Sequence, residues 1–161
     1  MNVLIVHYHL KPGGVTSVIR RQASALSARG VRVQGIFGEP PGTDPGFEFS
    51  IEPALGYDAA SSMDAPDPDG VRVITEAIRK AVVRMGPETV IHVHNPTLRK
   101  NASLLPALSR LADDGLPLLM HVHDLAEDWR PTVYPRSGYP DGAAWAVING
   151  RDAEALRASG A

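Results

Sequence analysis

Short apolar runs alternate with longer amphipathic segments along the chain, and this alternation limits the folds open to it. The first run, residues 2–8, is apolar almost throughout, which is typical of a strand buried on both faces of a parallel sheet. Similar runs occupy residues 31–37, 89–94, 118–123 and 144–148, with a shorter one at 47–51. Strands separated by helix-length segments predict an α/β fold with a doubly wound, mostly parallel, Rossmann-like sheet in a three-layer αβα arrangement.

The segments between the runs carry apolar residues at helical spacing and end at glycines. We expect helices at 15–26, 71–85, 104–111 and 152–158, the last with Asp152 close to its N-cap. Residues 38–70 are rich in Pro, Gly and Asp, and outside 47–51 they predict an exposed loop. The length of 161 residues predicts a single domain over 1–161.

Composition excludes several classes of protein. A formal net charge of −2 lacks the basic excess of a nucleic-acid binder. The chain has no cysteine, which excludes disulfides and thiolate metal sites, and no signal peptide is evident. No apolar stretch is long enough to cross a bilayer. These features predict a cytoplasmic protein and leave open peripheral contact with the inner face of the membrane.

All six histidines fall in His-x-His pairs that each close a predicted strand. Because the carboxyl ends of parallel strands meet at one edge, the pairs should converge there. Side chains two residues apart share a face, about 6.5–7 Å apart, so one imidazole of each pair should lie deeper than the other. This predicts His9, His94 and His123 at the rim, as ligand contacts, and packed core positions for His7, His92 and His121.

A glycine pair, Gly13-Gly14, lies between the first predicted strand and the first helix. Without a Cβ the backbone can approach a ligand, and the helix N-terminus offers N–H groups to an anion such as a diphosphate. A tight turn with no ligand explains the pair equally well. The turn is not G-x-G-x-x-G, and residues 36–38 at the end of the second strand carry no acid. Both features argue against a nicotinamide cofactor.

Two connecting segments carry further polar residues. The first, 95–101 (NPTLRKN), places Arg99 and Lys100 at the predicted start of a helix, where cations are unfavourable unless an anion offsets them. They are either ligand contacts or solvated surface charges. The second, 124–139 (DLAEDWRPTVYPRSGY), combines acidic, aromatic and arginine side chains. That composition suits a binding lip for a sugar, or alternatively a structured surface loop.

Four segments together resemble the N-terminal domain of family-four retaining glycosyltransferases with the GT-B fold. They are KPGGVTSVIRRQASALSARG, HVHNPTLRKN, HVHDLAEDWRP and VINGRDAEALRASGA, and the similarity covers nearly the whole chain. In that family the N-terminal domain mostly binds the acceptor, and a C-terminal domain binds the nucleotide-sugar donor.

The resemblance assigns roles to particular residues. Gly13 and Gly14 would form the glycine loop near the donor diphosphate, and His123 would be the catalytic histidine beside the donor sugar. The residues implied for substrate binding are His9, Lys11, His94, Asn95, Lys100, Asp124, Asp128 and Arg130. The resemblance implies no cofactor and no metal, since the nucleotide sugar is a co-substrate.

The family's donor-binding domain has no counterpart in these 161 residues. We therefore expect the chain to be a fragment or single domain, the N-terminal half of a hexosyltransferase-type enzyme, inactive alone. Its expected partners are a nucleotide-sugar donor, a sugar or lipid-linked acceptor and its own C-terminal domain, with no nucleic acid.

Two alternatives remain open from the residues. His-x-His pairs at strand ends are also how hydrolases present imidazoles to Zn²⁺, although a hydrolase barrel needs about eight strands. A non-catalytic α/β ligand-binding module of the flavodoxin or receiver type is the other. A receiver would want acidic residues after its first strand, where this chain has His7, Tyr8 and His9.

Overall fold

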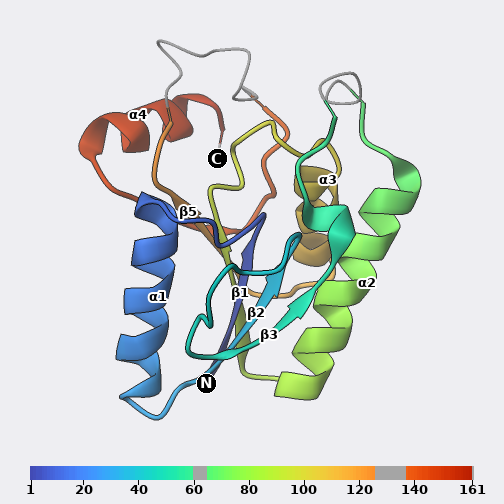
Figure 1. The fold of residues 1–161 in the computed structure, drawn as a ribbon. Coiled ribbons are helices and arrows are strands. Elements are labelled where there is room, and N and C mark those ends of the chain that lie inside the picture. Colours follow the sequence, from blue (N-terminus) through green and yellow to red (C-terminus); the bar gives the residue numbers. More distant parts are fainter. Residues whose placement is uncertain (60–64, 126–136, 161) are drawn as a thin grey trace.

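A single six-stranded parallel sheet organises the protein (Figure 1). The computed structural model describes residues 1–59, 65–125 and 137–160. The strands are β1 (Asn2–His7), β2 (Arg32–Phe37), β3 (Glu48–Ile51), β4 (Thr89–His94), β5 (Leu118–Val122) and β6 (Ala144–Val147). Their order, β3-β2-β1-β4-β5-β6 with every pair parallel, is the Rossmann order. The predicted fold class is confirmed.

Helices lie on both faces of the sheet, α1 on one side and α2 and α3 on the other (Figure 1). Their bounds are α1 (Gly14–Ser27), α2 (Pro68–Met85), α3 (Leu104–Asp113) and α4 (Gly150–Ala158), and a short 3₁₀ helix, η1 (Pro53–Leu55), follows β3. The predicted helices are all present. α2 ends at Gly86, whose φ of 107° is open only to glycine.

The predicted start of α4 was wrong, and so was the position given to Arg99 and Lys100 relative to α3. α4 is capped by Asn149, whose Oδ1 accepts a hydrogen bond from the Asp152 amide at 2.8 Å, so Asp152 lies inside the first turn. α3 begins at Leu104, as the apolar spacing predicts, with Ser103 at the N-cap position. Arg99 and Lys100 therefore lie in the preceding turn, and the argument that they oppose the dipole of α3 does not hold.

Apolar side chains fill the two interfaces between sheet and helices. On the α2–α3 side, Val93 of β4 packs in one cluster with Ile78 and Leu108. On the α1 side, Ile5 and Val33 pack with Ile19. The α1-side cluster includes no residue of β4 or β5 among those described. Histidines occupy α1-facing positions of these two strands, at 92, 94 and 121.

The chain reverses its winding between β1 and β4, which are neighbours in the sheet. Ligands of such sheets bind outside the carboxyl ends of the strands at this switch point. The sheet is open within the described residues, with β3 and β6 at its edges, which excludes a closed hydrolase barrel. Its order also differs from the 2-1-3-4-5 order of flavodoxin-like and receiver proteins.

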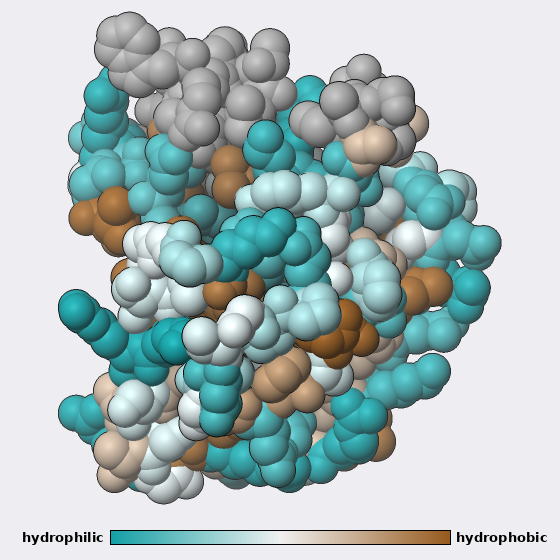
Figure 2. Space-filling model, in the orientation of Figure 1, coloured by the Kyte–Doolittle hydropathy of each residue, from teal (hydrophilic) through white to brown (hydrophobic). Residues whose placement is uncertain are grey.

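The visible surface is mostly hydrophilic, with apolar residues in separate patches (Figure 2). Across the described part of the chain, no helix combines the length and the apolar character that a bilayer crossing requires.

Gly38 provides a test of the packing at the carboxyl end of β2. A Cβ there would overlap the backbone nitrogen of Gly56 and lie 2.6 Å from its Cα. Backbone cannot yield as a flexible side chain can, so Gly38→Ala should lower the free energy of unfolding by about 1–3 kcal/mol. Gly42→Ala is the matched control, because its Cβ meets nothing within 4 Å. Urea denaturation measures both, and equal stabilities would contradict this packing.

Candidate functional site

Four imidazole rings lie together where β4 and β5 end, and we call them the histidine quartet: His92, His94, His121 and His123. The parallel register sets His94 beside His121. His92 Nε2 lies 3.1 Å from His121 Nδ1, and His94 Nδ1 lies 2.8 Å from His123 Nε2. The rings of each pair are nearly parallel, at 6° and 11°. Because Ile91, Val93 and Met120 point into the α2–α3 core, the quartet faces the α1 side.

His7 extends this cluster across the switch point. Its Nδ1 donates a hydrogen bond to the carbonyl oxygen of His94 at 3.0 Å. The ring centroid of His7 lies 6.3 Å from that of His94 and 5.7 Å from that of His9. All six histidines therefore meet along one edge of the sheet, as predicted.

The predicted depths of two histidines were wrong. His94 is 0% exposed and does not lie at the rim. The segment that follows β4 is also buried, including Asn95 and Thr97. The spacing of residues along a strand does not reveal whether the following segment will be buried. His121, predicted to be deep, is half-buried. His7 and His92 are buried at 4% and 6%, as expected, while His9 and His123 are half-buried near the edge.

Asn95 joins the ends of β4 and β5. Its φ is 50°, a left-handed conformation that asparagine tolerates better than most residues. The backbone N–H of Asn95 donates to the backbone carbonyl of His121 at 2.8 Å. Its side-chain Oδ1 accepts a hydrogen bond from the backbone N–H of His123 at 2.7 Å. The side chain is 5% exposed. In this structure Asn95 holds the backbone of His123 in place.

Burial keeps the clustered imidazoles neutral. It lowers the pKa of His7 to about 4, against the opposing hydrogen bond to His94. Burial, and then the neighbouring His121, lowers the pKa of both His92 and His123 to about 4. The pKa values of His94 and His121 are lowered by burial as well. At neutral pH each ring thus has one N–H donor and one lone pair.

A second group lies beside the quartet, and we call it the rim cluster: His9, Lys11, Glu39, Tyr57 and Lys100. The Tyr57 hydroxyl lies 3.2 Å from His9 Nε2, and the Lys100 ammonium lies 5.8 Å from the centre of the Tyr57 ring. Lys11 pairs with Glu39 at 2.7 Å. Tyr57 is 44% exposed. The cluster presents an aromatic face with hydrogen-bonding groups around it.

The glycine turn opens onto a groove of about 390 Å³ between the start of α1 and the loop after β2. Gly13, Thr16 and Arg20 line one side, and Gly42 and Thr43 the other. Arg20 donates to the Thr43 hydroxyl at 2.5 Å, and its Nε has no hydrogen-bond partner among the described residues. A Cβ on Gly14 would meet nothing within 4 Å. Packing therefore does not require glycine at position 14.

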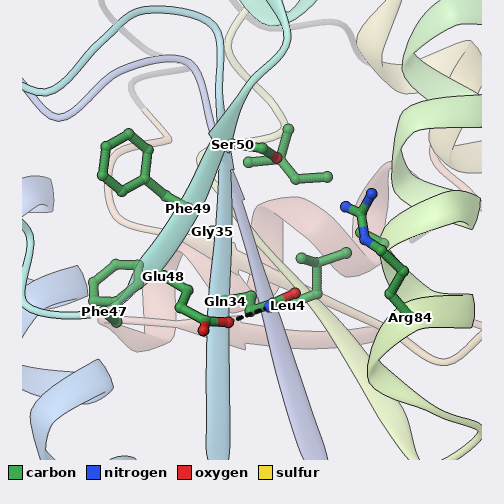
Figure 3. Close-up of a pocket in the computed structure, with 10 residues that line it drawn as sticks. Leu4, Gln34, Gly35, Phe47, Glu48, Phe49, Ser50 and Arg84 are labelled. Atoms are coloured by element: carbon green, nitrogen blue, oxygen red, sulfur yellow. Dashed lines mark hydrogen bonds between the residues drawn. The ribbon is translucent and has the colours of Figure 1, made fainter.

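Another groove of similar size lies at the edge strand β3, between Gln34, Glu48 and Arg84 (Figure 3). Gln34 Nε2 donates to the Glu48 carboxylate across it. Its lining includes no histidine and no residue from the carboxyl ends of β1, β4 or β5. We therefore place the functional site at the quartet and the rim cluster.

Sequence reasoning missed Glu39 and Tyr57 of the rim cluster, and Arg20 of the groove at the glycine turn. Tyr57 follows η1 beyond the carboxyl end of β3, so the rule that ligands bind at strand ends could have identified it. Arg20 was assigned only to a helix. Asp124 is exposed just beyond β5, and Asp128 and Arg130 lie outside the described residues.

Comparisons with known proteins found a matching family model and a similar solved structure. The profile of a family described as "Glycosyl transferase 4-like domain" matches residues 13–160. No match was found among curated proteins. Among solved structures, apo UGT2 of Phytolacca americana matches with a TM-score of 0.49 and 12% identity, over 78% of this chain. The chain spans only 30% of that protein, and so distant a likeness supports no inference about activity.

The lowered histidine pKa values predict that the fold loses stability in mild acid. An unfolded histidine titrates near 6.5, whereas His7, His92 and His123 titrate at about 4 when folded. Between these values the unfolded chain binds more protons, so the free energy of unfolding falls as pH drops from about 6.5 to 4. The loss is up to ~1.4 kcal/mol per pH unit for each of the buried His7 and His92, and less for the half-buried His123, which solvent screens.

Denaturation at a series of pH values measures this slope. His7→Asn keeps a donor for the His94 carbonyl, but asparagine does not titrate. The free energy of unfolding of this variant should therefore change less steeply with pH, by the contribution of up to one proton. A flat profile for the wild type, or identical slopes for both proteins, would show that these rings are not held neutral.

Proposed function

The chain belongs to the glycosyl transferase 4-like domain family, and from that premise we propose that it is the acceptor-side half of a retaining hexosyltransferase. The reaction would move a sugar from a nucleotide-sugar donor to an acceptor hydroxyl. The observation that carries the proposal is the position of His123. It lies half-buried beyond β5, near the switch point, with its backbone and its ring both held by neighbours.

His123 is suited to orient a donor sugar. Asn95 Oδ1 holds its backbone N–H, and His94 holds its Nε2, which leaves Nδ1 as the ring nitrogen for a ligand. Burial lowers its pKa to about 4, so the ring is neutral at pH 7 and can hydrogen-bond a sugar hydroxyl. Because the ring is held before substrate arrives, little reorganisation is needed on binding. His94 and Asn95 then act as positioning residues.

The glycine turn is suited to the donor diphosphate. The free N–H groups at the start of α1 favour an anion, and the open space at Gly14 lets phosphate oxygens approach the backbone. Arg20 adds a positive charge in the adjoining groove. Charge that develops on the leaving diphosphate would be stabilised there, and one preorganised donor of this kind contributes up to about 3–4 kcal/mol.

The rim cluster is suited to a sugar acceptor. The Tyr57 ring offers an apolar face, while His9, Lys11 and Lys100 offer hydrogen bonds around it. Asp124 lies exposed beyond His123, and we propose that Asp124, Asp128 and Arg130 also bind the acceptor. The donor nucleotide would be held by a further domain. We therefore expect the 161 residues alone to catalyse no transfer.

Replacing His123 tests the proposal. In the full-length protein, His123→Ala should lower release of nucleoside diphosphate from a panel of nucleotide sugars by about 10²–10³-fold. Arg84→Ala is the control, because Arg84 lines the β3 groove away from the carboxyl ends of β1, β4 and β5, and it should leave release unchanged. Circular dichroism and thermal melting establish that both variants fold. Near-normal release by folded His123→Ala would reject the role.

Gly14→Ala should raise the stability of the fold slightly and at the same time weaken binding of the nucleotide sugar. The added methyl group meets no protein atom, and alanine favours a helix, so thermal stability should rise slightly, by about 0.5 kcal/mol. The same methyl group would obstruct a diphosphate at the turn, raising KM for the nucleotide sugar. An unchanged KM would place the diphosphate elsewhere.

A further inference from the structure

Three rings of the histidine quartet have the arrangement of a metal site. One nitrogen from each of His92, His94 and His121 lies within 4.8 Å of the other two. The rings come from two adjacent strands whose register pairs His94 with His121, so the backbone of the sheet holds them together. The transfer reaction proposed above requires no direct contact with any of these three rings.

His94 contains an unsatisfied buried atom. Its Nδ1 is bonded to His123, but its Nε2 is buried and has no hydrogen-bond partner among the described residues. An unpaired buried polar atom costs about 1–3 kcal/mol. If the proton is on Nδ1, the lone pair of Nε2 points into the protein with nothing to accept. A metal ion bound to this nitrogen would satisfy it.

We propose that His92, His94 and His121 bind one divalent transition-metal ion of the zinc class, His94 through Nε2. Imidazole nitrogens suit zinc, copper and nickel, whereas calcium and magnesium require oxygen ligands. The three-ring group contains no carboxylate. His121 is half-buried, so the site has an approach from the surface, and a fourth ligand can come from water.

Binding requires the rings to move closer. Zinc–nitrogen bonds of about 2.0–2.1 Å place tetrahedral ligand atoms about 3.4 Å apart, and His92 Nε2 and His121 Nδ1 are already 3.1 Å apart. The three ligand nitrogens lie within 4.8 Å of one another, so rotation of the His94 side chain can bring its nitrogen to this spacing while β4 and β5 stay in register.

The ion would also determine the proton on His123, a consequence that rests on the proposed function. A metal on His94 Nε2 requires the proton on His94 Nδ1, which then donates to His123 Nε2. His123 would thereby carry its own proton on Nδ1, the nitrogen assigned to the donor sugar. The ion is thus a positioning element behind the active-site histidine, and not a participant in transfer.

Zinc titration tests the site directly. Tag-free protein, stripped with a chelator and dialysed, is titrated with zinc chloride in a calorimeter, and we expect saturation at one ion per chain. His121→Gln removes a ligand and should weaken binding by at least ~10-fold. His9→Gln is the matched control, because it removes an imidazole outside the three-ring group and should leave affinity unchanged. Absence of saturable binding, or equal affinities for wild type and His121→Gln, would overturn the proposal.

Histidine ¹⁵N NMR of the wild-type protein keeps the test decisive if a variant does not fold. Zinc should shift the ring nitrogens of His92, His94 and His121 and convert His94 fully to the tautomer with its proton on Nδ1. Shifts confined to other histidines would overturn the site. Neither experiment uses a nucleotide sugar, so failure here leaves the proposed transferase function standing, and the reverse also holds.

Discussion

The register of β4 against β5 is the constraint on which the site depends. Pairing His94 with His121 places four imidazoles on one face of two adjacent strands, and Asn95 then connects the two strand ends through the His121 carbonyl and the His123 amide. A slip of one residue would turn one strand's histidines to the α2–α3 core. The apolar residues that alternate with them, Val93 and Met120, are fully buried there, so the hydrophobic core enforces the geometry of the polar site.

Two different kinds of side chain cover the α1 side of the sheet. Over β1 and β2, apolar residues pack against α1. Over β4 and β5, the corresponding layer is made of neutral imidazoles that bond to one another. Such a layer is stable only while its rings stay uncharged, because burial disfavours the charged form. The same burial lowers the pKa of His123 to about 4 and leaves its ring neutral at pH 7. The stability of the fold and the protonation of the sheet edge are therefore linked.

Periodicity and chain order were sufficient to predict most of this structure. Continuous apolar runs separated by helical segments specify a parallel sheet, and the convergence of the histidines followed from the geometry of its carboxyl edge. The errors occurred where hydrophobic periodicity does not determine the burial or the position of a residue. Burial of His94 depends on the segment that packs over it. Arg99 and Lys100 lie before α3, which begins at Leu104, and the polar residues there carry no periodicity that separates a turn from the first turn of a helix. Tyr57 lies in a segment without periodicity, and only the position of β3 beside β2 brings it to His9.

Structure determination of the protein with a bound nucleotide sugar would test the central claim most directly. We predict that the diphosphate lies at Gly13 and Gly14 and that a hydroxyl of the transferred sugar is within hydrogen-bond distance of His123 Nδ1. A nucleotide sugar bound at the β3 groove of Figure 3, or anywhere else away from the carboxyl ends of β1, β4 and β5, would contradict the account.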